Sequence, residues 1–285
     1  MAIKTVLCPV DFTSISQAEI LSAVEVCSRF GARLVIEHNL DPRPPPSLGV
    51  GWMWSSSVDA RERKHEAEAR KRLQGIFKTV PKVVPVEAKL TRGPIAQTLL
   101  QLAHELPADL IVAASHGKST AEHESLTEQI VTQSACAVMT THAEPLRLAE
   151  GAEIVVAIDF SPASEAALEC AFAIAERAPV RLVLFHVETP FEDGFLPPRD
   201  PESRRSAGGA MAAAIPADLA GRSEIAFGHN DPARAILDCA KSRNAGAIVL
   251  GLHPRGIFHK HLSDRAREVL HQSRCPIWFV PVGAC

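Results

Sequence analysis

The feature that most constrains the fold is a short stretch of sequence that occurs twice. Residues 6–16 read VLCPVDFTSIS, and residues 154–164, 148 positions later, read IVVAIDFSPAS. In each copy an apolar run, typical of a buried strand, stops at an aspartate and leads into a helix start rich in hydroxyl side chains. Asp11 and Asp159 therefore fall at the carboxyl end of a strand, where open α/β sheets place their ligands.

The elements that follow each copy also recur in one order. We expect strands at residues 3–10, 34–36, 83–90, 109–114 and 137–139 in the first half, and at 154–158, 182–187, 224–227, 247–251 and 276–280 in the second. Helical patterns lie between them, as at 59–77, 163–177 and 264–272. This alternation predicts, in each half, a five-stranded parallel sheet with helices on both faces. We therefore divide the chain into two tandem α/β domains, 1–145 and 152–285.

Composition narrows the classes of function. The 285 residues exceed one typical domain, and the net charge of -3 creates no global field that would attract nucleic acid or an acidic membrane. We expect neither as a partner. The N-terminal residues lack the layout of a signal peptide, and the seven cysteines form no CxxC pair. These features predict a reducing, cytoplasmic location.

Taken together, these patterns resemble the universal stress protein family in its tandem, two-domain form. The resemblance rests on the strand-Asp-Phe-hydroxyl opening, the strands ending at His38 and His186, and the closing pattern AREVLHQSRCPI at residues 266–277. It implies a stress-response function and a flavodoxin-like (adenine nucleotide alpha hydrolase-like) fold. Because members of this family pair through the fifth strand, it also implies that the two halves pack as an internal pseudo-dimer.

Many proteins of this family bind ATP through a loop after the fourth strand, which reads Gly, two residues, Gly, nine residues, Gly, then Ser or Thr. Glycines let the backbone approach phosphates, and the following helix N-terminus adds positive potential. By position, the resemblance places Asp11 and Asp159 near the adenine and ribose. The candidate ligand residues are Asp11, His38, Gly117, Lys118, Ser119, Ser125 and Asp159.

Both copies of this loop depart from the family pattern. In the first half Thr120 stands where the second glycine belongs, and Glu124 replaces the third. In the second half Pro254 removes an N–H donor, and Asp264 follows Ser263 where Gly-Ser would stand. Since carboxylates suit helix N-termini, the two acids are interpreted as caps that fill an anion site. We predict that neither half binds ATP in the standard way, and that the first is the better candidate for residual binding.

Two questions about individual side chains stay open in the sequence. Asp11 and Asp159 suit a ligand role and a helix-capping role equally well. The histidines His253, His259 and His261 could ligate zinc, but we favour exposed loop histidines and predict no metal site.

The sequence favours a non-catalytic protein, because no nucleophile signature is present. The alternative is an ATP-binding switch or weak ATPase that uses the first half. The segment Trp52-Met53-Trp54 either folds back on the domain or offers a surface to a partner. Protein partners remain unspecified, and a homodimer is a further alternative to a pseudo-dimer alone.

Overall fold

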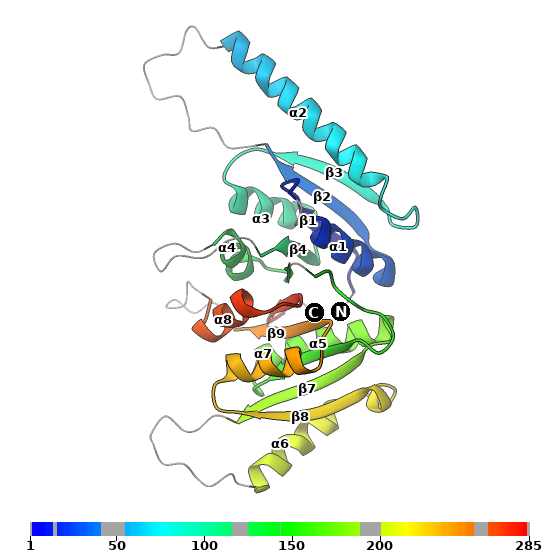
Figure 1. Cartoon of the computed structure of the whole chain (residues 1–285), viewed down its shortest axis with the longest axis vertical. Helices are drawn as coiled ribbons and strands as arrows, with labels where there is room; N and C mark the ends of the chain where they lie inside the picture. The colour runs from blue at the N-terminus through cyan, green and yellow to red at the C-terminus, as the bar shows by residue number, and fades with distance from the viewer. Residues whose placement is uncertain are drawn as a thin grey trace.

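The computed structural model contains one continuous ten-stranded sheet with helices on both faces (Figure 1). It describes residues 2–13, 16–40, 55–115, 125–142, 144–188, 201–253 and 262–283. The strand order is β3-β2-β1-β4-β5-β10-β9-β6-β7-β8, so the first half of the chain forms one side of the sheet and the second half the other. The repeat in the sequence is therefore a repeat in the fold.

The strands and α-helices of the two halves match one to one, and the second half adds a short 3-10 turn. The first half contains β1 (Thr5–Pro9), α1 (Ser16–Phe30), β2 (Arg33–Asn39), α2 (Ser55–Phe77), β3 (Val86–Thr91), α3 (Ile95–Glu105), β4 (Leu110–Ala114), α4 (Leu126–Gln133) and β5 (Ala137–Thr141). The second contains β6 (Glu153–Ile158), α5 (Pro162–Arg177), β7 (Arg181–Glu188), α6 (Pro201–Ala214), a 3-10 turn (Ala220–Arg222), β8 (Ser223–His229), α7 (Pro232–Ser242), β9 (Ala247–Leu252), α8 (Asp264–Gln272) and β10 (Ile277–Pro281). Within each half all strand pairs are parallel.

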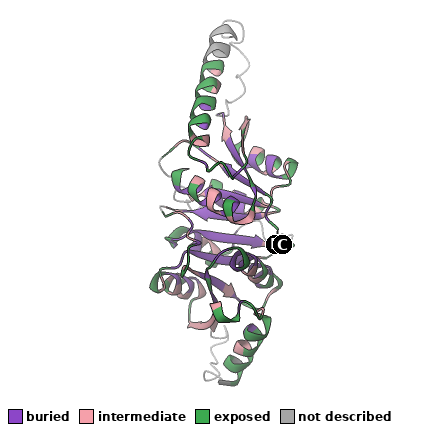
Figure 2. Ribbon diagram, turned by 90° about the vertical axis from the view of Figure 1, so that its right-hand side faces the viewer, coloured by how far each residue is buried: buried purple, intermediate pink, exposed green. Residues whose placement is uncertain are grey.

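The central strands are buried on both faces, as expected for parallel strands covered by helices (Figure 2). Two apolar cores result, one on each face of the sheet. One contains side chains from α1, α2, α5 and α6, such as Ala23, Leu73, Ala167 and Met211. The other contains side chains from α3, α4, α7 and α8, such as Leu99, Ile130, Ile236 and Val269. Continuous apolar runs in the sequence correspond to these doubly covered strands.

The two halves join where β5 and β10 pair in antiparallel fashion, which confirms pairing through the fifth strand. Met139 lies opposite Trp278, and Val138 lies opposite Phe279. All four side chains are fully buried, so the seam between the halves is a continuation of the core rather than a surface contact.

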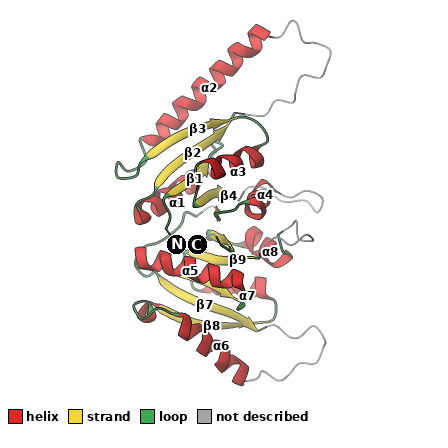
Figure 3. Cartoon of the chain, turned by 180° about the vertical axis from the view of Figure 1, so that it is seen from behind, coloured by secondary structure: helices red, strands yellow, loops and turns green. Residues whose placement is uncertain are grey.

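The linker between the halves is packed against both of them. Leu146 and Leu148 are buried in the core, and the Leu146 N–H donates to the Ser22 hydroxyl on α1 at 2.9 Å. The Arg147 guanidinium donates to the Asn244 carbonyl, just beyond α7, at 3.0 Å. Figure 3 shows α1 of the first half and α5 of the second as neighbours across the middle of the molecule, and Leu146 and Leu148 belong to the core that these two helices cover. These contacts fix the two halves relative to one another.

One expectation about the first half needs correction. The third strand begins at Val86 rather than at residue 83, because residues 81–84 form a turn and Pro85 has no N–H to donate. The helix that follows this strand, α3, buries Ala96, Leu99, Leu102 and Ala103, whereas Ile95 is 39 % exposed. Among the described residues, no helix combines the length and the apolar composition needed to cross a bilayer.

Candidate functional site

The larger of two equivalent clefts lies in the second half, at the carboxyl ends of β6, β7 and β9. We call it the second-half cleft. It has a volume of about 490 Å³, within the range of about 300–1,000 Å³ typical of small-molecule sites. Helices α5, α7 and α8 begin around it. Its lining combines apolar side chains with a few polar ones, among them Asp159, Phe185, His186, Ile236, Leu250, His253, Ser263 and Val269.

Asp159 presents an anionic acceptor at this cleft. One carboxylate oxygen accepts from the Ser161 N–H at 3.0 Å and from the Ser161 hydroxyl at 2.5 Å, and the other lies 3.6 Å from His253 Nε2. Burial alone would raise the pKa of Asp159, but the hydrogen bonds from Ser161 and Ser164 and the nearby His253 lower it overall. The carboxylate is therefore ionised at neutral pH.

Asp159 does not cap the helix that follows it. The N-cap of α5 is Ser161, whose side chain accepts from the Ser164 N–H at 3.2 Å. Asp159 instead stabilises the turn that precedes the helix. In the first half, Asp11 accepts from the Thr13 N–H at 2.9 Å in the same way. The capping interpretation is thus wrong for Asp159, whose second oxygen faces His253 across the cleft.

The histidine at the end of the second strand holds this turn in both halves. His38 Nδ1 lies 2.7 Å from the Val10 carbonyl, and His186 Nδ1 lies 2.7 Å from the Ile158 carbonyl. A carbonyl only accepts, so Nδ1 carries the proton in each ring. The neighbouring Phe12 and Phe160 adopt positive φ angles of 62° and 61°, and their rings contact these imidazoles in a tilted arrangement. Both histidines are therefore satisfied polar groups that support the strand end.

The equivalent cleft of the first half is smaller and acidic. We call it the first-half cleft; its volume is about 150 Å³. Asp11 and His38 line it together with Glu19 and Glu37, which are only 3 % and 1 % exposed. Glu19 accepts from the Ala114 N–H, and Glu37 accepts from the Thr91 hydroxyl. Burial raises the pKa of Glu37, although the hydrogen bond from Thr91 opposes this shift.

The two buried glutamates were not among the predicted site residues, yet the repeat contains the signal. At an offset of 148 positions, Glu19 corresponds to Ala167 and Glu37 to Phe185. Where one copy of the repeat has a buried carboxylate and the other a buried apolar residue, the two clefts must differ in charge at that position.

A single glycine allows one wall of the second-half cleft, the start of α5, to pack closely on β9. A Cβ atom at Gly251, at the end of β9, would lie 2.1 Å from the Ala163 carbonyl oxygen and 2.7 Å from the Ser164 nitrogen. The start of α5 can approach β9 only because this Cβ is missing. The corresponding residue of the first half is Ala114, whose N–H the Glu19 carboxylate satisfies.

A model of the universal stress protein family matches residues 2–142 and 152–281, which is nearly the whole chain. The chain belongs to the universal stress protein family. It is 26 % identical over 203 residues to a universal stress protein of Mycobacterium tuberculosis, an alignment that covers 67 % of this chain and 68 % of the relative. It is 33 % identical over 119 residues to universal stress protein A homolog 1 of Coxiella burnetii, covering 41 % of this chain and 79 % of the relative.

Solved structures support the same assignment at the level of the fold. A universal stress protein from Archaeoglobus fulgidus has a TM-score of 0.72, covering 98 % of this chain and 96 % of the other. At 18 % identity, this likeness shows the shared architecture alone. It extends over both halves of this universal stress protein and not over one domain only.

In this universal stress protein, the helices α4 and α8, which follow the fourth strand of each half, are capped by serines. Ser125 accepts from the Glu128 N–H at 3.2 Å and donates its own N–H to the Glu128 carboxylate at 2.8 Å, which forms a complete capping box. Ser263 accepts from the Ala266 N–H at 3.2 Å. Asp264 is not a cap: its carboxylate is fully exposed and lies 3.2 Å from Arg267. The capping interpretation of Asp264 is therefore wrong.

Several predicted site residues lie outside the described part of the chain. These are Gly117, Lys118, Ser119, Glu124, Pro254, His259 and His261, and also the segment Trp52-Met53-Trp54. Within the residues that the structure describes, no three His, Cys, Asp or Glu side chains come together as a metal site. Among the described residues, the acidic side chain beside His253 is Asp159, at 3.6 Å.

Proposed function

We propose that this universal stress protein is a non-catalytic stress-response protein that holds a small ligand in its second-half cleft, and that neither half binds ATP in the family's standard way. The observation that carries the proposal is the contrast between the two clefts. The second-half cleft has about 490 Å³ and a largely apolar lining with one carboxylate, Asp159, and one guanidinium, Arg265. The first-half cleft has about 150 Å³ and two buried glutamates. We therefore favour the second half for ligand binding, whereas the sequence alone favours the first.

The lining of the second-half cleft favours a compact ligand with an apolar ring and a hydroxyl or amine donor. Phe185, Ile236 and Leu250 supply apolar surface, and Asp159 accepts the donor. By resemblance to the family, a nucleoside such as adenosine fits this description.

A polyphosphate fits the same cleft less well. The Ala266 N–H at the start of α8 already has Ser263 as its acceptor, and Asp264 places negative charge in the same turn. The repulsion between this charge and a phosphate is weak, because the Asp264 carboxylate is fully exposed and lies 3.2 Å from Arg267, but it does not favour an anion. We therefore expect the phosphates of ATP to add little affinity or to reduce it.

The polar groups of the cleft support binding rather than catalysis. Ser161 donates its hydroxyl hydrogen to Asp159 and caps α5, and Asp159 faces His253 with its other oxygen. A hydrolytic triad needs the histidine between the hydroxyl and the carboxylate. In the described part of the cleft, that order is absent.

Calorimetric titration of the full chain with adenosine and with ATP tests the proposal. We expect adenosine to bind at least as tightly as ATP. Asp159→Asn should weaken adenosine binding by roughly 10–100-fold, the equivalent of a charge-assisted hydrogen bond worth about 1.5–3 kcal/mol. The matched variant Asp11→Asn should leave the affinity unchanged.

The opposite pattern would support the alternative function, an ATP-binding switch or weak ATPase in the first half. In that case ATP would bind far more tightly than adenosine, and Asp11→Asn would abolish binding while Asp159→Asn would not. The acidic lining of the first-half cleft argues against this outcome, because Glu19 and Glu37 would face the phosphates with like charge. We further propose that the protein acts through protein partners and not through nucleic acid or membranes.

A further inference from the structure

The seam between the halves has an approximate twofold symmetry that can be read from residue numbers. Near the end of each half the repeat offset is 139 positions, as for Cys136 and Cys275. Met139 and Trp278 have this same offset, and they pair directly across β5 and β10. A pseudo-twofold axis therefore passes between them, and each half presents the equivalent surface to the other. Such a surface is suited, in its geometry, to pairing with a copy of itself.

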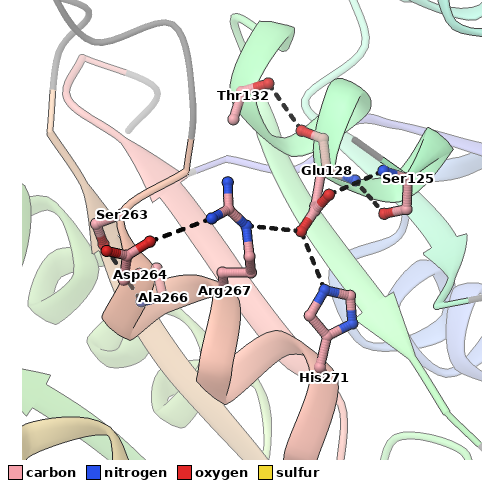
Figure 4. A network of polar contacts seen from close by, with 8 residues as sticks. All are labelled: Ser125, Glu128, Thr132, Ser263, Asp264, Ala266, Arg267 and His271. Carbon is pink, nitrogen blue, oxygen red and sulfur yellow. Dashed lines mark hydrogen bonds and ion pairs between the residues drawn. The ribbon is translucent and has the colours of Figure 1, made fainter. Parts of the chain in front are cut away.

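Charged residues on the two helices beside the seam break this symmetry. Glu128 of α4 and Arg267 of α8 occupy equivalent positions at the offset of 139, and Arg267 Nε lies 3.0 Å from the Glu128 carboxylate. His271, the equivalent of Thr132, brings its Nε2 to 3.0 Å from the same oxygen. Figure 4 shows both side chains of α8 converging on Glu128 from the opposite half. We call Glu128, Arg267 and His271 the seam cluster.

The seam cluster is largely withdrawn from solvent. The side chain of Glu128 is 1 % exposed, whereas those of Arg267 and His271 are 31 % and 27 % exposed. The second oxygen of Glu128 accepts the Ser125 N–H at 2.8 Å. Burial would raise the pKa of Glu128, but the bonds from Ser125 and His271 and the charge of Arg267 lower it overall. A buried carboxylate of this kind depends on its partners, because removing one leaves the charge uncompensated.

The uncharged part of the seam differs between the halves in side-chain volume. Met139 and Thr140 of β5 are equivalent to Trp278 and Phe279 of β10, and all four side chains are buried. Charge distinguishes the halves more sharply, because it sets the sign of the contact. Two first halves joined in this way would set Glu128 against Glu128, and two second halves would set Arg267 against Arg267. Like charges in a buried interface reject the wrong partner.

We propose that the seam cluster determines the partner of the fifth-strand surface: it accepts the unlike half and excludes a second copy of the same half. The partner that fits the β5 side is thus a universal stress domain with a cation at the position of Arg267. The interface is closed within one chain because only the unlike half supplies that cation.

The first test uses three full-chain variants and hydrogen exchange. Glu128→Arg and Arg267→Glu each create a like-charge seam, and the double variant restores opposite charges in the reverse arrangement. We expect each single variant to raise amide exchange in β5 and β10 by about tenfold or more, and the double variant to recover protection to within about threefold of the wild type. Glu68→Arg is the matched control, since it reverses an exposed charge whose partner, Arg72, lies 3.0 Å away. It should leave these strands unchanged.

The second test measures partner choice directly. The two single variants are unfolded in urea and refolded together at about 0.1–1 mM, close to the effective concentration of a short tether. Each first half then finds an opposite charge only on the other chain. We expect native mass spectrometry to show a two-chain species in the mixture and not in either variant alone. Wild-type protection in the single variants, no recovery in the double variant, or a mixture of single chains only would each overturn the proposal.

Discussion

The substitution Gly251→Ala tests how closely α5 approaches the end of β9. The backbone of Gly251 does not need a positive φ angle, so the expected effect is purely steric. The added Cβ would lie 2.1 Å from the Ala163 carbonyl oxygen, whereas ordinary contacts begin near 3.5 Å. The first turn of α5 must therefore move by about 1 Å or more.

This movement has two costs. Overpacking of a tight contact costs about 1–3 kcal/mol, and disturbing the Ser161 cap costs about 1 kcal/mol. We expect a total loss of about 2–4 kcal/mol in the free energy of unfolding, measured by urea denaturation, and a decrease of roughly 5–10 °C in Tm. Because the same turn positions Asp159, adenosine affinity should fall as well.

Gly209→Ala provides the control for this experiment. Gly209 lies within α6, and a Cβ there meets no atom within 4 Å. Replacing a helical glycine by alanine should stabilise the protein by about 0.5–1 kcal/mol. A Gly251→Ala protein as stable as the wild type, with unchanged ligand affinity, would refute the close approach of α5 to β9 and the account of the cleft that depends on it.

Three further predictions concern titratable groups. Burial raises the pKa of Glu37 above its unfolded value of about 4.3, so ionisation of this side chain opposes folding. As pH rises from about 4 towards neutral, the wild type should lose stability relative to Glu37→Gln. Urea unfolding at several pH values measures this difference. Ionisation of Glu128 favours folding instead, since the pKa of this carboxyl is lowered overall in the folded protein. Its contribution to the free energy of unfolding is present above about pH 4.3 and should disappear as pH falls further. The stability of the wild type should therefore converge on that of Glu128→Gln at low pH in the same assay. Burial raises the pKa of Cys27 to about 12, so its thiol should resist a disulfide reagent at pH 8 in the native protein and react at once when the chain is unfolded.

The fold could be predicted from the sequence because its two signals are strong and repeated. Doubly buried parallel strands appear as apolar runs, and the 148-position repeat fixed the order of elements in both halves. Strand ends were less certain: Pro85 delays β3 to Val86, since a strand residue without an N–H cannot join the ladder. Pairing through the fifth strand came from resemblance to the family, and the β5–β10 ladder confirms it.

The candidate site was predicted only in part. Asp11 and His38 line one cleft and Asp159 lines the other, but the contact between Asp159 and His253 was not among the expectations. The relative size of the clefts could not be foreseen, because it depends on the side chain of Glu19 reaching the Ala114 N–H across the domain. Contacts between positions so distant in sequence carry no local pattern. The pairing of Glu128 with Arg267 is similar, although the offset of 139 made it discoverable once the seam was known.

The nucleotide content of the purified full chain tests the central claim most directly. The protein is denatured, and the released small molecules are identified by absorbance and mass spectrometry. The described geometry, with its capped helix starts and acidic first-half cleft, predicts far less than one ATP per chain. Adenine nucleotide at close to one triphosphate per chain would contradict the account, because it would require a phosphate site that neither cleft is expected to provide.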